Sequence, residues 1–379
     1  MKYIILRCED FARSGGPAAA LLEGAKTAHL QQLAQAGAIG LIGRHGKPPA
    51  VDRFHLHRAL FGLGPQDVDA APARCYAASV NLQLAPGETA WCADLMTHQD
   101  DRIIDSTAGN IPTKESEVLI HSLNERLGSA TQRWEVGDGP HHLFVVSGSP
   151  LGTNGQWSGR APELLVGHAW KRVLPKSEFG KALQSLIEEA ASLLESHAIN
   201  RVRIDLGENP ANIIWLWGPA DDQPCQTFAH RTGLSGAITS NSFPMRGLAH
   251  ALGLDWKEAP ASLEERAFAR IMKVVAELIE RHDLVYVHLR IGSGDPVERL
   301  CAMERIDQLL LKPLTERLPS LGPWRLLAAI DDRKTGAVPF VAVGNDLPQQ
   351  PAARLDAQSL AESPLAFEDG VKLFSWFTK

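Results

Sequence analysis

The sequence has few of the features that mark secreted, membrane-spanning or nucleic-acid-binding proteins. Its five cysteines are scattered over 379 residues without a Cys-x-x-Cys pair, so we expect reduced thiols rather than a disulfide framework or a zinc site. Apolar runs fall short of the roughly 18 residues that span a bilayer. The net charge of −6 gives no support for a nucleic-acid or anionic-membrane partner.

The N-terminus also lacks a signal peptide, because Glu9, Asp10 and Arg13 interrupt its apolar stretch. We therefore expect a cytoplasmic protein. The sequence contains no G-x-G-x-x-G, P-loop or nucleophile-elbow motif, so nucleotide binding has no support. Gly292-Ser-Gly294 follows a predicted strand and is typical of a tight turn, with an anion-binding nest as the alternative.

What the chain does contain is an alternation of strands and helices. Predicted strands cover 3–6, 38–42, 213–217, 236–239, 284–289, 325–330 and 339–343. Predicted helices cover 27–36, 54–62, 179–197, 244–252, 263–281 and 298–317, the last kinked at Pro313. This alternation predicts an α/β fold with a mostly parallel sheet that has helices on both faces.

The stretch 71–175 differs in pattern and predicts an inserted α+β domain. It contains predicted strands at 75–84, 89–96 and 142–147 and a helix at 114–127 with Thr113 as its N-cap. The α/β core would then comprise residues 1–70 and 176–379.

Acidic residues follow two predicted buried strands. Glu9 and Asp10 follow the strand at 3–6, and Asp331 and Asp332 follow the strand at 325–330. Ligands of open α/β sheets bind outside the carboxyl ends of the strands. The pattern therefore predicts a functional edge at these strand ends.

Five further stretches occur in order along most of the chain. They are Asp105-Ser-Thr-Ala-Gly-Asn-Ile-Pro, Asn209-Pro-Ala-Asn-Ile-Ile-Trp-Leu-Trp-Gly218, Gly233-Leu-Ser-Gly-Ala-Ile-Thr-Ser240, Glu304-Arg-Ile-Asp307 and Val338-Pro-Phe-Val341. Together they resemble the motifs D-Y-S-A-G-H-I, P-A-N-x-I-W-L-W-G, G-L-x-G-A-x-I-S, E-R-I-D and V-P-F-L. These belong to the archaeal-type cofactor-independent phosphoglycerate mutases of the alkaline phosphatase superfamily.

The resemblance implies an alkaline-phosphatase-like core with an inserted cap. It also implies phosphoryl transfer through a phosphorylated serine, and two divalent cations (Mn²⁺, Mg²⁺ or Zn²⁺) between the strand ends. By motif position it implies that Asp105, Asn110 and His142 contact the substrate. Glu9 stands where the first strand of the family carries a metal ligand.

The chain departs from this family at the residues that carry the chemistry. Val51 or Arg53 stands where the resemblance places the serine, and neither can carry a phosphoryl ester. The Asp and His ligands expected after the strand at 284–289 are missing, and Asp332 replaces a histidine. We therefore expect no catalytic residue and no cofactor beyond one weak hard-cation site.

The carboxylates of Glu9, Asp331 and Asp332 would form that cation site. The alternative that we favour is that they bind strand-end amides or pair with Arg7, Arg53 and Arg333, which would replace the lost cations electrostatically.

The remaining candidate residues favour ordinary structural roles. His55 and His57 are two residues apart, which is the wrong spacing for one helical face, so we do not expect them to form a metal site with His45. Trp215 and Trp217 alternate along a predicted strand and are typical of a core pair.

Two functions follow from these observations. The first is a phosphoglycerate-mutase-like protein that has lost the two-metal mechanism and binds a small phosphorylated or anionic metabolite, or a protein partner. The second is an active mutase that interconverts 3- and 2-phosphoglycerate.

Overall fold

The computed structural model describes residues 1–9, 11, 24–43, 53–64, 67, 71–148, 159–223, 225–291, 295–330, 337–350, 352 and 354–379. The chain forms two compact units. Unit 1 comprises Met1–Pro65 and Gln226–Lys379, and unit 2 comprises Gln66–Cys225. None of the described helices is long and apolar enough to cross a membrane.

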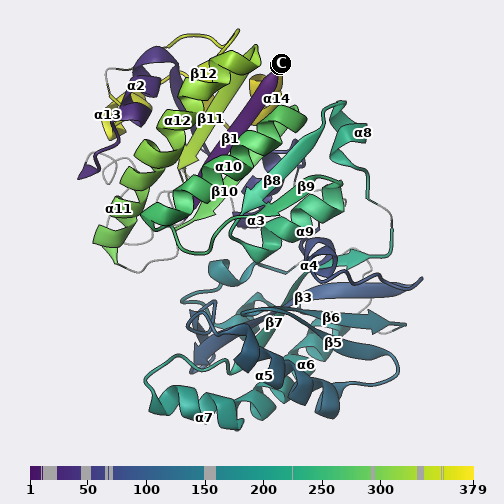
Figure 1. Ribbon diagram of the computed structural model, residues 1–379. Helices are drawn as coiled ribbons and strands as arrows, with labels where there is room; N and C mark the ends of the chain where they lie inside the picture. Colours follow the sequence, from purple (N-terminus) through teal and green to yellow (C-terminus); the bar gives the residue numbers. More distant parts are fainter. Residues whose placement is uncertain are drawn as a thin grey trace. The chain divides into compact units, whose positions relative to one another are not determined.

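Unit 1 is built on a sheet in the order β13-β2-β12-β11-β1-β10-β8-β9. Its described strands are β1 (Lys2–Glu9), β2 (Ala38–Ile42), β8 (Gly236–Ser240), β9 (Asp255–Glu258), β10 (Leu284–Arg290), β11 (Trp324–Ile330), β12 (Val338–Gly344) and β13 (Ala366–Phe367). Only β12 runs antiparallel to its neighbours β11 and β2 among these pairs. In Figure 1, β1 is the purple strand between β11 and β10. The predicted mostly parallel sheet is therefore confirmed.

The two faces of this sheet differ in chemistry. Ile4, Leu6 and Cys8 of β1 point into an apolar cluster, which they share with Ala237 of β8 and with alternate residues of β10 and β11. That cluster also contains buried side chains of α2 (Ala28–Ala36), α10 (Glu265–Arg281), α11 (Pro296–Ile306) and α12 (Lys312–Arg317). Because strand side chains alternate between faces, Arg7 and Glu9 point to the opposite face.

The opposite face is covered by an aromatic layer. Tyr286 of β10 packs against Phe61, which follows α3 (Arg53–Ala59), and Tyr3 of β1 packs against Phe377 of α14 (Gly370–Thr378). Among the described residues of unit 1, the remaining α-helices are α8 (Phe228–Thr232), α9 (Phe243–Leu252) and α13 (Ala357–Glu362). Helices therefore pack on both faces of the sheet, as predicted.

The predicted helix at 298–317 changes from α-helical to π-helical hydrogen bonding before Pro313. Helix α11 ends at Ile306, a π-helical turn covers Asp307–Leu311, and α12 begins at Lys312. Pro313 has no backbone N–H to donate to the preceding turn, and a widened turn accommodates its ring. A π-helical turn therefore lies directly before the position at which a kink was predicted.

Unit 2 contains an antiparallel sheet in the order β4-β3-β6-β5, with β7 also paired to β3. Its strands are β3 (Glu88–Gln99), β4 (Arg102–Asp105), β5 (Gln132–Asp138), β6 (His141–Ser147) and β7 (Ile213–Asp221). Its described α-helices are α4 (Pro72–Ser79), α5 (Thr113–Leu127), α6 (Glu178–Glu195) and α7 (Ala198–Asp205). The α+β character of the insert matches the expectation.

The boundaries of unit 2 differ from the predicted insert. The prediction ended the insert at residue 175, whereas the unit continues to Cys225. The reason is that β7 pairs with β3 from Met96↔Ile213 to Thr89↔Asp221, which commits the preceding α6 and α7 to the same unit. The alternation of elements alone does not reveal which sheet a strand joins.

Two local predictions in unit 2 were wrong. The stretch 75–84 was predicted as a strand, but residues Pro72–Ser79 form α4. Pro72 occupies the first turn of this helix, a position that proline favours, and this signal outweighs the apolar pattern that follows it. Thr113 is the first residue of α5 rather than its N-cap, which is Pro112.

Candidate functional site in unit 1

A row of polar side chains crosses the middle of the unit 1 sheet. Parallel pairing places Arg7 of β1 beside His288 of β10, and His288 beside Ser240 of β8. Glu9 is the next residue on the same face of β1, and His57 reaches it from α3. All five side chains are buried. The site therefore lies near the carboxyl end of β1, on the face opposite the apolar cluster.

Glu9 is the centre of this group. Its Oε2 atom lies 2.8 Å from Nε2 of His288 and 3.3 Å from Nε2 of His57. The two imidazole rings are almost perpendicular, with an interplanar angle of 84° and centroids 4.5 Å apart. Two rings from separate elements therefore converge on one carboxylate oxygen.

The outer nitrogen of each histidine contacts a hydroxyl group. Nδ1 of His57 lies 2.7 Å from the Tyr286 hydroxyl, and Nδ1 of His288 lies 2.7 Å from the Ser240 hydroxyl. Ser240 Oγ also accepts the backbone N–H of Ser242 at 3.1 Å. These contacts fix the orientation of both rings and form a continuous chain from Tyr286 through Glu9 to Ser240.

Burial keeps both imidazoles neutral. Desolvation lowers the pKa of His57 well below its usual value, and the nearby charge of Arg7 lowers it further. Desolvation also lowers the pKa of His288, although its hydrogen bond to Glu9 acts in the opposite direction. At neutral pH both imidazoles of the group are therefore uncharged, beside the positive charge of Arg7.

Only part of this group could be predicted from the sequence. Glu9 lies at the strand end where a functional edge was expected. Asp331 and Asp332, the other two predicted metal ligands, lie outside the described residues. His57 was not expected to bind a metal because of its spacing from His55. His55 does not join the group and lies near Arg58. The partner that His57 finds is His288, which lies far away in the sequence.

His288 was missed altogether, although the sequence contains a signal for it. Tyr286, His288 and Arg290 alternate with Val285, Val287 and Leu289 on a buried strand. A histidine on the polar side of such a strand requires partners, because a buried polar group without them is costly. That polar alternation marks His288 as a buried residue that needs a polar partner, but it does not identify Glu9 as that partner.

The donor set fits a single metal ion. Among the described residues, Glu9, His57 and His288 form the only group of three or more His, Cys, Asp or Glu residues close enough to hold an ion, and their ligand atoms lie within 4.8 Å of one another. One carboxylate oxygen and two imidazoles suffice for one cation. They do not supply the ligands of the two cations implied by the resemblance.

Predicted ligand-binding residues in unit 2

Asp105 holds a loop together. Its carboxylate accepts hydrogen bonds from the backbone N–H groups of Thr107 and Gly109, the Thr107 hydroxyl and the side-chain amide of Asn209. These hydrogen bonds lower the pKa of Asp105 against the opposing effect of partial burial. The contacts account for the aspartate of this motif without a ligand.

The loop that follows has an unusual backbone. Ala108, Gly109 and Asn110 all have positive φ angles, of 47°, 68° and 55°. Left-handed backbone is costly for alanine and must be stabilised by its surroundings. One source of that stabilisation is Arg203, whose Nη2 donates to the carbonyl oxygen of Ala108 at 2.8 Å.

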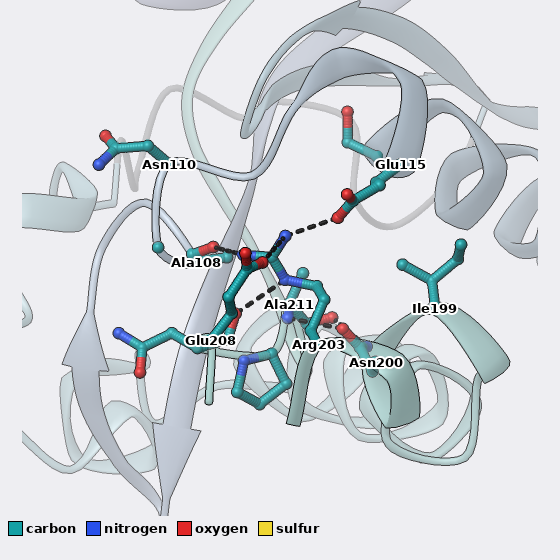
Figure 2. Close-up of polar contacts among 12 residues, drawn as sticks. Ala108, Asn110, Glu115, Ile199, Asn200, Arg203, Glu208 and Ala211 are labelled. Carbon is teal, nitrogen blue, oxygen red and sulfur yellow. Dashed lines mark hydrogen bonds and ion pairs between the residues drawn. The ribbon is translucent and has the colours of Figure 1, made fainter. Parts of the chain in front are cut away.

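Arg203 is buried and connects several parts of unit 2 (Figure 2). Its guanidinium also forms ion pairs with Glu115 of α5 and with Glu208, at 2.5 and 3.0 Å, and donates to the carbonyl oxygen of Asn209. Figure 2 shows the exposed side chain of Asn110 directed away from this guanidinium. Of the two predicted substrate contacts in this loop, Asp105 and Asn110, Asn110 is therefore the one whose side chain is accessible.

His142 is placed differently from the expectation. It is fully buried on β6, and its Nδ1 accepts the backbone N–H of Gly137 at 3.0 Å. Burial lowers the pKa of His142 to about 3. A neutral, enclosed imidazole is a poor ligand for an anion, so the geometry favours a structural role.

The neighbouring His141 is the more accessible of the two histidines. Its Nδ1 lies 2.6 Å from Oδ1 of the buried Asp94 and 2.9 Å from the Tyr76 hydroxyl. Trp217 donates its indole N–H to the other oxygen of Asp94. Trp215 and Trp217 are both buried, as expected of a core pair.

Similarity to known proteins

The fold and the site together define a class of protein. It is a mixed α/β protein in which a mostly parallel sheet carries one carboxylate and two imidazoles at a strand end, and in which the chain is interrupted by a unit built on an antiparallel sheet. Residues 34–200 match the family model described as 2,3-bisphosphoglycerate-independent phosphoglycerate mutase.

Proteins of similar sequence belong to the same family. A 2,3-bisphosphoglycerate-independent phosphoglycerate mutase 2 from Methanothermobacter thermautotrophicus is 30% identical over 312 residues, covering 78% of this chain and 75% of the relative. A probable 2,3-bisphosphoglycerate-independent phosphoglycerate mutase from Geobacter sulfurreducens is 28% identical, covering 98% of both chains. The chain therefore belongs to the 2,3-bisphosphoglycerate-independent phosphoglycerate mutase family.

Solved structures share the fold. The cofactor-independent phosphoglycerate mutase from Thermoplasma acidophilum matches with a TM-score of 0.59 and 20% identity, covering 100% of this chain and 99% of that one. A protein from Pyrococcus horikoshii matches with a TM-score of 0.68 and 17% identity, covering 100% of this chain and 96% of that one. At these identities the likeness establishes the fold alone.

Proposed function

We propose that this chain binds a small phosphorylated or otherwise anionic metabolite without carrying out the two-metal phosphoserine reaction. The observation that carries the proposal is the engagement of Glu9. Its Oε2 atom contacts both His57 and His288, so this strand end presents one carboxylate and two imidazoles, a donor set for one cation rather than for the two that the phosphoserine reaction needs.

The residues at the expected position of the nucleophile also argue against the phosphoserine reaction. Val51 or Arg53 stands where a serine is needed, and no phosphoryl ester can form on either side chain. A two-metal site also needs ligands for a second ion, whereas the described residues supply donors for one.

The charges at the site suit an anionic ligand. Arg7 lies among the buried residues of the polar row, and Arg290 ends β10 beside Glu9. Both positive charges act on His288, because each contributes to lowering its pKa. Positive charge at the carboxyl end of a parallel sheet favours phosphate or carboxylate groups.

Two assays on the purified protein test this proposal. Mutase and phosphatase turnover is measured with 3-phosphoglycerate in Mn²⁺, Mg²⁺ or Zn²⁺, and binding of 3-phosphoglycerate is measured by calorimetry. The proposal expects saturable binding without turnover. Turnover that is lost in Glu9→Ala would overturn it.

The second candidate function is an active mutase. The Glu9, His57 and His288 group favours it, since these side chains offer a carboxylate and two imidazoles to a cation. Its remaining ligands would have to come from residues outside the described ranges, among them Asp10, Asp331 and Asp332. The turnover assay separates this candidate from the first.

A further inference from the structure

We propose that Glu9, His57 and His288 form a mononuclear site for a borderline transition-metal ion, of which Zn²⁺ is the expected occupant. This site differs from the expected hard-cation site in its donors, because two of its three ligands are histidines. Glu9 is the one residue that the two sites share.

The first support is the direction of the rings. Both imidazoles present Nε2 to the same oxygen of Glu9, Oε2, and their planes lie 84° apart. Tetrahedral zinc with bonds of about 2.0–2.1 Å separates its light ligand atoms by roughly 3.3 Å. The 3.3 Å between Nε2 of His57 and Oε2 of Glu9 equals that spacing, whereas the 2.8 Å between Nε2 of His288 and Oε2 of Glu9 is a hydrogen-bond distance that would lengthen by about 0.5 Å around an ion.

The second support is the pair of hydroxyl contacts behind the rings. A histidine that binds a metal through Nε2 donates its Nδ1–H to an outer partner, which fixes the tautomer and the orientation. Tyr286 and Ser240 occupy that position at 2.7 Å on His57 and His288. Ser240 Oγ accepts Ser242 N–H as well, and the oxygen has a second lone pair for His288.

The chemical class of the ion follows from the donors and the neighbouring charge. Imidazole suits Zn²⁺, Cu²⁺, Ni²⁺ and Co²⁺, whereas Mg²⁺ and Ca²⁺ prefer sites made entirely of oxygen ligands. Arg7 lies buried in the same row and opposes any cation electrostatically. The nitrogen donors must therefore supply the affinity, which excludes a hard ion held mainly by charge.

The proposal is independent of metabolite binding, and it is tested by metal binding alone. The intact protein is stripped with a chelator, and Co²⁺ or Zn²⁺ is added in the absence of any phosphoglycerate. We expect one equivalent to bind, with a Co²⁺ visible absorption spectrum typical of four- or five-coordination and a rise in melting temperature. The metal-free alternative, in which both Nε2–H groups donate to Glu9, predicts no bound ion.

Variants locate the site. His57→Gln and His288→Gln should abolish the Co²⁺ spectrum, and Tyr286→Phe and Ser240→Ala should weaken Zn²⁺ binding about 10- to 100-fold. His230→Gln is the matched control, because His230 is exposed in the same unit. Wild-type protein that binds no Zn²⁺, or His57→Gln and His288→Gln variants that bind it as tightly as wild type, would overturn the proposal. The wild-type measurement decides the matter even if a variant fails to fold.

Discussion

Nε2 of His288 lies 2.8 Å from Oε2 of Glu9, although the two residues are 279 positions apart in the sequence. The contact exists because β1 and β10 are parallel neighbours in the sheet, with Glu9 paired to Arg290 and Arg7 paired to His288. A site assembled in this way depends on the sheet and is invisible to local spacing rules.

Replacement of Glu9 tests how strongly that contact stabilises the fold. Glu9→Ala leaves the hydrogen bonds of two buried histidines unmade and removes a negative charge from beside Arg7. We expect the free energy of unfolding to fall by about 3–5 kcal/mol, as when one partner is removed from a buried charged group. Urea denaturation measures it, with the exposed Glu277→Ala of α10 as the control. A loss equal to that of the control would contradict this account.

His142 should make unit 2 sensitive to acid. Its folded-state pKa of about 3 lies below that of the unfolded chain, so its contribution to stability is present above about pH 6.5 and is lost as the pH falls. We expect His142→Leu to reduce the loss of stability between pH 7 and pH 5 by about 2 kcal/mol. Urea unfolding at the two pH values measures it.

The control for this pH experiment is His121→Gln, because His121 is exposed on α5. That variant should retain the wild-type difference between pH 7 and pH 5. An unchanged difference in His142→Leu as well would mean that His142 is not held neutral by burial.

Asp307 should stabilise the start of a distant helix. Its two carboxylate oxygens accept the backbone N–H groups of His29 and Leu30 at the beginning of α2. Asp307→Ala leaves both donors without their acceptor, so we expect a loss of about 2–4 kcal/mol in unfolding free energy. Hydrogen exchange of the Leu30 amide should accelerate in parallel.

Asp307→Asn provides the comparison for this variant, because it retains one oxygen acceptor. Burial raises the pKa of Asp307, so ionisation works against folding above the unfolded-state pKa, and the neutral amide avoids that cost. The asparagine variant should therefore be more stable than the alanine variant. Equal losses in both would argue against the capping role.

Arg203 should determine the conformation of the loop at Ala108. Arg203→Lys removes the planar group that contacts two carbonyl oxygens and two carboxylates, and a lysine cannot reproduce that geometry. We expect a loss of about 3–5 kcal/mol in the stability of unit 2. The exposed Arg201→Lys on α7 is the control, and a similarly small effect in both would refute the role.

Much of the fold could be predicted from the sequence, because the elements that were found have long, regular patterns. Helix α6, for example, begins after the Ser177 cap and buries Leu183, Ile187 and Leu194 on one face. The prediction failed where sheet membership decides the outcome, since Ile213–Asp221 reads as another core strand until its pairing with β3 is known.

The candidate site was harder to predict for the same reason. Glu9 was found because a carboxylate at a strand end is a local signal. His57 was rejected on a local spacing, and His288 drew no notice within an apolar run. The Glu304 and Asp307 carboxylates of the E-R-I-D motif, which helped to carry the resemblance, accept backbone N–H groups of Lys26, His29 and Leu30 and so stabilise the fold.

The side chains of β1 alternate between an apolar face and a polar face, and this alternation limits which substitutions the family can accept. A slip of one residue would drive Arg7 and Glu9 into the layer of α2 and α10, so the register cannot drift. Substitutions confined to the polar side leave that constraint untouched. The register of the sheet and the residues of its polar face can therefore evolve separately. A member of the family can exchange one set of metal or anion ligands for another while its fold stays recognisable.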